Sequence, residues 1–150
     1  MTARFTLPPS TPGPVTGQDI NVAATLTRAV LDELLAAEGT MFGEWLVLTT
    51  LARRGGASGR EQLAADVALG IDPGKPLADA LDHLELRGLV RAGADEVALT
   101  ADGTTEHARL RDDIAGLTAE LYRDMDAADL VAAKRVLNTV TERAAARLAS

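Results

Sequence analysis

The sequence predicts a mainly α-helical fold that carries one small β-hairpin. Two patterns lead to this expectation: apolar residues recur at helical spacing through six segments of the 150-residue chain, and one short stretch alternates as two strands around a turn. Hydrophobic residues make up 47% of the chain, which is enough to build a core and too many for a disordered protein.

Composition narrows the classes of function. The chain has no Cys, which excludes disulfides, thiolate metal sites and a cysteine nucleophile. Aromatic residues are 3%, too few for a surface that stacks single-stranded nucleic acid. No apolar run approaches the ~18 residues that span a membrane, and residues 1–10 lack the apolar segment of a signal peptide. We therefore expect a soluble cytoplasmic protein with no membrane partner.

The first helix follows a tail rich in proline. Residues 1–15 hold four of the six prolines, a composition typical of a flexible, extended segment. Thr16 and Asp19 are spaced as a capping box, which predicts the start of a helix. Apolar residues then recur at helical spacing up to a stop at Gly39; they are Val22, Leu26, Val30 and Leu34.

Three shorter helices are predicted next. The first runs from about Phe42 to Arg53, the second is capped by Ser58, and the third opens with Asp72 and Pro73 as N-cap and first residue. Gly88 ends the third. We expect their buried faces to carry Phe42, Trp45, Leu46 and Thr49, then Leu63, Ala64 and Val67, then Leu77, Leu81 and Leu84.

The hairpin and two long helices complete the chain. Residues 89–91 and 96–99 predict two strands joined by a turn. Thr100 caps a fifth helix, and a sixth begins at residues 126–129. Their apolar stripes are Leu110, Ile114, Leu117 and Leu121 in the fifth, and Leu130, Ala133, Leu137, Val140, Ala144 and Leu148 in the sixth.

This order of elements describes a winged helix-turn-helix flanked by long helices. In that arrangement the third short helix enters the DNA major groove and the hairpin lies alongside. We predict a tail over 1–15, a helical dimerisation region over 16–40 and 101–150, and the winged helix-turn-helix over 41–100. So small a central module cannot cover the stripes at both ends, which indicates a homodimer.

Three passages appear in a specific order and spacing. They are LDHLELRGLVR at residues 81–91, VALTADG at 97–103, and WLVLTTLA at 45–52 followed by EQLA at 61–64. Across about residues 20–148 they resemble the MarR family of bacterial transcription regulators. The resemblance implies a homodimer that binds a pseudo-palindromic operator in double-stranded DNA, often releasing it when a small-molecule effector binds.

The sequence departs from the family at two places that read DNA. Family wings usually carry Asp-x-Arg, whereas residues 92–96 contain two acids and no basic residue. The recognition helix has Ala78 and Asp79 where the family usually shows Thr and Arg, and His83 where it shows a second Arg. An alternative function therefore stays open: a winged-helix dimer that has lost DNA reading and serves as a protein-interaction or ligand-sensing module.

The candidate DNA-binding residues lie on or near the third and fourth helices and the first hairpin strand. They are Arg54, Ser58, Arg60, Lys75, Asp79, His83, Arg87 and Arg91. Residues 53–91 hold six basic and six acidic side chains, so DNA affinity requires the cations to cluster on one face. Arg60 and Lys75 are expected at helix starts, where backbone N–H groups also favour phosphate.

Each candidate also has a structural interpretation. Arg60 and Lys75 are equally consistent with solvated surface charges, and Arg54 with a complement to the helix dipole. His83 either contacts DNA or hydrogen-bonds to Asp79. Asp79 either accepts from cytosine N4 or repels the phosphates.

Evidence for other chemistry is sparse. Met41, Phe42 and Trp45 are either core residues or the wall of an effector pocket. His107 and its acidic neighbours lack metal-ligand spacing, so we expect a solvated face there and no metal. No nucleophile–base set or phosphate loop is present. We predict neither an enzyme nor a bound cofactor.

Overall fold

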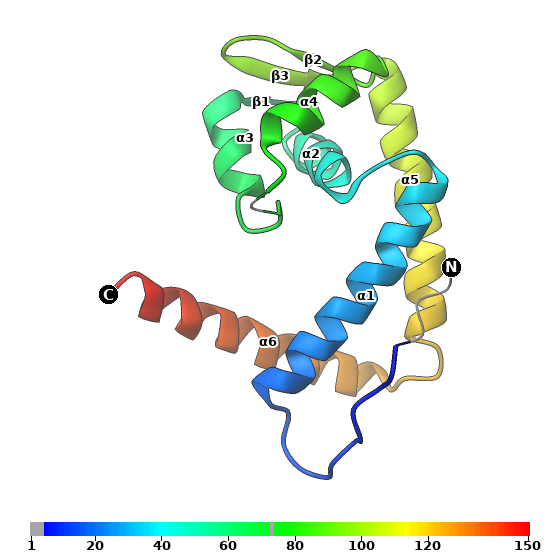
Figure 1. The fold of residues 1–150 in the computed structure, drawn as a ribbon, viewed down its shortest axis with the longest axis vertical. Helices are drawn as coiled ribbons and strands as arrows, with labels where there is room; N and C mark the ends of the chain where they lie inside the picture. The colour runs from blue at the N-terminus through cyan, green and yellow to red at the C-terminus, as the bar shows by residue number, and fades with distance from the viewer. Residues whose placement is uncertain (1–4, 73) are drawn as a thin grey trace. The chain divides into compact units, whose positions relative to one another are not determined.

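The computed structural model describes residues 5–72 and 74–150, which form two compact units, Met1–His107 and Ala108–Ser150 (Figure 1). The tail prediction for residues 1–4 and the helical start assigned to Pro73 lie outside the described residues. Residues 5–16 are exposed and contain no helix or strand. The predicted fold class is confirmed, with one more strand than expected.

Helix α1 (Gly17–Ala37) begins and ends as the sequence predicts. The Thr16 hydroxyl accepts a hydrogen bond from the backbone N–H of Asp19, and the Asp19 carboxylate accepts one from the backbone N–H of Thr16, which completes the capping box. The pKa of Asp19 is lowered chiefly because the Thr16 hydroxyl also donates to its carboxylate at 2.6 Å, and next by the bond from the Thr16 backbone N–H. Gly39 ends the helix with φ +66°, a conformation that favours glycine.

Helix α2 (Phe42–Arg53) has the predicted bounds but a different buried face. Val47, Leu48 and Leu51 are fully buried, whereas the predicted face of Phe42, Trp45, Leu46 and Thr49 is half-buried. The prediction of that face was wrong because α2 is the central helix of the unit. It packs against α1, α3, α4 and the sheet, so several of its sides are covered.

The strand that the sequence analysis missed is β1 (Ala57–Gly59), which precedes α3 (Arg60–Val67). Ser58 pairs with Val97 in the sheet, and its hydroxyl donates to the carbonyl of Gly59 at 3.2 Å. Gly59, not Ser58, is the N-cap of α3, so the predicted capping box was wrong. Leu63 and Val67 are buried as expected, while Ala64 is exposed.

Helix α4 (Leu77–Leu86) starts later than Asp72 and Pro73 predicted. Its N-cap is Pro76, and a proline disfavours helical geometry in the residue before it. A helix opened at residue 72 would have to pass through that position. The end is as predicted, since Gly88 follows the C-cap with φ +71°.

The hairpin of β2 (Val90–Ala92) and β3 (Glu96–Leu99) joins β1 in an antiparallel sheet of order β1-β3-β2. Thr100 begins α5 (Ala101–Leu121) as predicted, because its hydroxyl accepts from the backbone N–H of Gly103 at 3.0 Å. Gly103 has a steric role: a Cβ there would lie 1.9 Å from the carbonyl oxygen of Leu89.

The core of the first unit is formed by the four helices α1, α2, α3 and α4 together with the sheet. Its fully or almost fully buried apolar side chains are Leu35, Val47, Leu48, Leu51, Leu63, Val67, Leu81, Leu84, Val90 and Val97. In Figure 1 the hairpin lies beside α4, and α2 lies among α3, α4 and the sheet. This packing presents the opposite side of α4 to solvent.

The second unit contains the later part of α5 and α6 (Ala127–Leu148). Asp126 caps α6 as predicted, accepting from the backbone N–H groups of Ala128 and Asp129. No residue of α6 is buried. Large apolar side chains are exposed along it, namely Val131, Val136, Leu137, Val140 and Leu148.

Candidate nucleic-acid interface and ligand cavity

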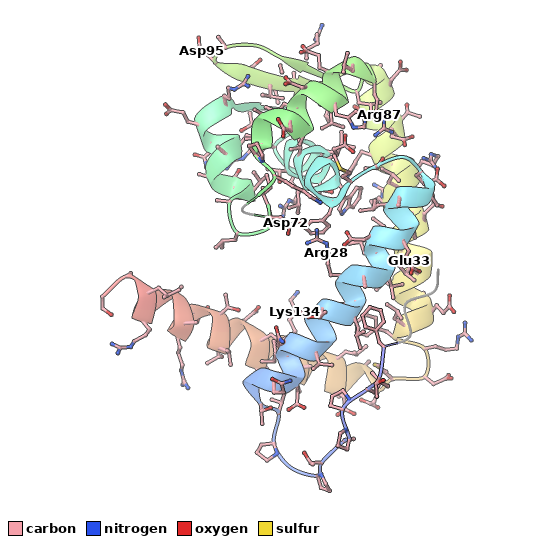
Figure 2. The ribbon with its side chains drawn as sticks, in the orientation of Figure 1. Arg28, Glu33, Asp72, Arg87, Asp95 and Lys134 are labelled. Carbon is pink, nitrogen blue, oxygen red and sulfur yellow. The ribbon has the colours of Figure 1, made fainter. Side chains whose placement is uncertain are left out.

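The surface that a winged helix turns toward DNA is formed here by α3, α4 and the hairpin. An open groove of about 1010 Å³ lies among them, lined by residues that include Arg60, Ala78 and Asp95. Figure 2 shows Asp95 at the tip of the hairpin. Asp79, Asp82 and Glu85 are exposed on α4, so its solvent side is acidic.

Arg60 ties the start of α3 to the hairpin. Its Nη1 donates to the carbonyl of Gly93 at 2.9 Å, and its backbone N–H donates to the carbonyl of Asp95 at 2.8 Å. The side chain is half-buried, so part of it is still accessible to solvent beside the wing. Arg60 thus holds the wing in place and stays close enough to the surface to meet a phosphate.

Arg54 is occupied by an ion pair within the unit. Its Nε donates to Asp66 Oδ2 at 2.5 Å, which joins the end of α2 to α3. The hydrogen bond raises the pKa of Arg54, and the same bond, with one from Gln62, lowers the pKa of Asp66. A phosphate would have to compete with Asp66 for this guanidinium.

A buried carboxylate from α2 contacts two side chains near the C-terminal end of α4. Glu44 of α2 is fully buried, and its Oε2 accepts from the backbone N–H of Met41 at 2.6 Å. Its Oε1 contacts His83 Nδ1, and its Oε2 lies 3.8 Å from Arg87 Nη1. Arg87 also donates to the Thr40 hydroxyl at 3.1 Å.

This cluster changes the interpretation of two candidate DNA-binding residues. The partner of His83 is Glu44 and not Asp79, and Arg87 is engaged by Glu44 and Glu106 within the unit. Sequence reasoning missed Glu44, which reads as an ordinary acid in the first turn of a helix. One signal was available: Glu44 stands three residues after Met41, the spacing of a capping residue.

The remaining candidates differ in exposure. Ser58 is 7% exposed and lies within the sheet, so its hydroxyl is not presented to DNA. Lys75 lies in the loop before α4, and its side chain is 70% exposed. Arg91 on β2 is exposed and forms no ion pair within the described part of the chain. Exposed cations near α4 are therefore few.

A separate cavity of about 430 Å³ lies among α1, the start of α2, the loop before α4 and the first turn of α4. Of the three residues singled out as core or pocket wall, Met41 and Phe42 line this cavity and Trp45 does not. The Trp45 ring stacks on His107 instead, with ring centroids 5.2 Å apart. The cavity also contains charged side chains that the sequence analysis did not include, among them Arg28 and Asp72 (Figure 2).

Among the described residues, no three His, Asp or Glu side chains gather in a way that could hold a metal ion. No helix within residues 5–72 and 74–150 is long and apolar enough to cross a membrane.

Comparison with known proteins places the fold. No protein-family model and no curated protein matches the sequence. Among solved structures, a MarR transcriptional regulator from Methanosarcina mazei Go1 matches with a TM-score of 0.71 and 19% identity, over 88% of this chain and 93% of that one. A mutant MarR from E. coli matches with a TM-score of 0.69 and 20% identity, over 87% and 99%.

A third neighbour is a regulator whose ligand is known. The structure of Bordetella bronchiseptica BpsR, solved to explain how 6-hydroxynicotinic acid regulates its DNA binding, matches with a TM-score of 0.68 and 20% identity. The match covers 86% of this chain and 99% of that one. At such identities these likenesses show the fold. The family resemblance seen in the sequence is confirmed at that level: the chain has the winged-helix fold of MarR-family regulators.

Proposed function

We propose that this chain, with the winged-helix fold of MarR-family regulators, is a transcription regulator that binds double-stranded DNA as a homodimer. The observation that carries the proposal is the presentation of α4: one side is buried in the core, and the other faces solvent beside the hairpin. In winged helices this face enters the major groove, with the two copies about 34 Å apart on the duplex. The role is non-enzymatic.

The charges of the interface predict weak binding that depends strongly on salt. Arg60, Lys75 and Arg91 are the cations offered, since Arg54 and Arg87 are engaged by carboxylates within the unit. Lys75 lies 4.0 Å from Asp72, but its side chain is 70% exposed and so stays accessible to a phosphate. Three phosphate contacts from each of two subunits give a log–log salt slope of about −5. Asp79, Asp82 and Glu85 oppose the approach of phosphates.

A charge reversal on α4 tests the proposal. Asp79→Arg removes a repulsion and adds a cation, so the affinity for duplex DNA should rise about tenfold at low salt. Arg60→Ala should weaken binding almost equally across sequences, because a phosphate contact carries no base specificity. Asp112→Arg makes the same charge change at an exposed position of α5 and should have a smaller effect. The measurement is titration of labelled duplex at two salt concentrations.

A second function is favoured by the acidic surface itself. Exposed carboxylates on α4 and at residues 95–96 of the hairpin would suit a basic protein partner better than DNA. If Asp79→Arg fails to tighten DNA binding and Arg60→Ala has no effect, α4 does not face DNA. The protein-interaction module then becomes the better proposal.

The proposed regulator also responds to a small-molecule effector, bound in the cavity lined by Met41 and Phe42. Support comes from the position of the cavity, which the first turn of α4 helps to form. A ligand there would touch the helix proposed to read DNA. Effector control of DNA binding is described for BpsR, which shares this fold.

A further inference from the structure

The cavity at the start of α4 has an unusual balance of charge. Its wall includes two cations, Arg28 and Lys75, and four carboxylates, Asp32, Glu44, Asp72 and Asp79. Arg87 lies outside the wall and offsets Glu44 at 3.8 Å. The wall itself holds more carboxylates than cations, so the cavity does not offer the positive charge that a carboxylate ligand needs.

Both cations of the wall are already engaged. Arg28 Nε donates to Asp32 Oδ1 at 2.8 Å, and its Nη2 lies 3.5 Å from Asp72 Oδ2. The Arg28 guanidinium also covers the Phe42 ring, with its central carbon 3.4 Å from the ring centroid. Lys75 Nζ lies 4.0 Å from Asp72. An anionic ligand would therefore have to displace carboxylates from the cations before it could bind.

Asp79 is the carboxylate without a partner. It lies in the first turn of α4, where the helix dipole favours a negative charge, and its side chain makes no hydrogen bond or ion pair among the described residues. Apolar side chains line the same cavity, among them Met41, Phe42 and Ile71. Met41 is 46% exposed, so a ligand with an apolar body would cover surface now left to water.

We propose that this cavity binds an organic amine, with the ammonium group on Asp79 and an apolar or aromatic body against Met41 and Ile71. A volume of about 430 Å³ suits a small ligand of this kind. An ammonium group supplies the charge that the cavity lacks and leaves the Arg28 pairs intact. This proposal rests on the proposed function only for the idea that an effector bound in the cavity changes DNA binding.

Matched ligands test the sign of the charge directly. Tyramine and 4-hydroxyphenylacetate share a phenol ring, and phenethylamine and phenylacetate share a benzene ring, but each pair differs in carrying an amine or a carboxylate. Calorimetric titration of the full-length protein should show that both amines bind more tightly than their acids. Tighter binding of either acid, or no binding of either amine, overturns the proposal.

Substitutions locate the site without reference to DNA. Asp79→Asn should weaken amine binding about tenfold or more, because it removes a charged hydrogen bond. Asp82→Asn, which makes the same change on α4 outside the cavity wall, should leave the affinity unchanged. An unchanged affinity in Asp79→Asn contradicts the assignment. Since no DNA is present, failure here is distinct from failure of the DNA-binding proposal.

Discussion

The two units of the chain solve the problem of apolar surface in opposite ways. In the unit Met1–His107, large apolar side chains of four helices and a sheet are buried together in one core. In the unit Ala108–Ser150, α6 buries no residue and leaves Val131, Val136, Leu137 and Val140 open to solvent. The first unit thus has a core of its own, whereas α6 of the second exposes a stripe of large apolar side chains.

The same contrast holds for charge. Within the first unit, carboxylates engage Arg28, Arg54 and Arg87 across different elements. Within the second, ion pairs such as Arg109 with Asp113 and Arg111 with Asp112 join neighbours on one helix. Pairs between elements fix how those elements pack, whereas exposed pairs along one helix contribute little to stability. The first unit is therefore held together by contacts between its elements, and the second is the part of the chain in which we expect the dimer contact.

The largest expected effect is on assembly. Leu137→Asp places a charge in the exposed apolar stripe of α6, so the chain should become monomeric or unfold. Asn138→Asp adds the same charge at the adjacent polar position and should keep the dimer. Light scattering after size-exclusion chromatography measures the mass. A folded monomer of the unmodified protein at micromolar concentration would show that α6 needs no partner.

A smaller effect is expected at the buried carboxylate of the first unit. Glu44→Ala removes the acceptor of the Met41 backbone N–H and the carboxylate beside His83 and Arg87, at a cost of about 3 kcal/mol in the free energy of unfolding. Glu61→Ala, at an exposed position of α3, should change it by less than about 0.5 kcal/mol. Denaturant unfolding of both variants measures this free energy. Equal values would mean that the Glu44 cluster does not help to hold the unit together.

The smallest effect concerns acid pH. The pKa of Asp66 is lowered in the folded chain, chiefly by the hydrogen bond from Arg54, so the pair stabilises the protein above the ordinary pKa of an Asp. That contribution is lost as the pH falls through the lowered pKa. Asp66→Asn should therefore flatten the dependence of Tm on pH below about pH 5. Asp112→Asn, at an exposed position, should keep the slope of the unmodified chain.

Much of the fold could be predicted because its signals are local. The capping residues Thr16, Thr100 and Asp126 each bond to a backbone N–H two or three positions ahead. Gly39 and Gly88 adopt the positive φ that ends a helix. Such features act between residues close in sequence, so spacing alone reveals them.

The errors in the sequence predictions share one cause: each concerns a contact between residues that are far apart in the sequence. Ser58 looks like a helix cap, yet Ala57–Gly59 forms a strand because β3, about 40 residues away, offers an edge to pair with. His83 looks suited to Asp79 one turn before it, yet it contacts Glu44, 39 residues earlier. Periodicity also misplaced the buried face of α2, since it does not say how many neighbours surround a helix.

Backbone propensity, capping and apolar spacing are local properties, so they were enough to predict the order of helices and hairpin, most of their ends, and a set of cations near α4. Which of those cations are paired with carboxylates depends on how distant elements pack. Arg87 donates to Thr40, 47 residues away, and Arg54 to Asp66, so both are engaged before DNA arrives. A surface can offer DNA only those cations that carboxylates of the same protein have not already paired. Such pairs form only when elements distant in sequence pack together.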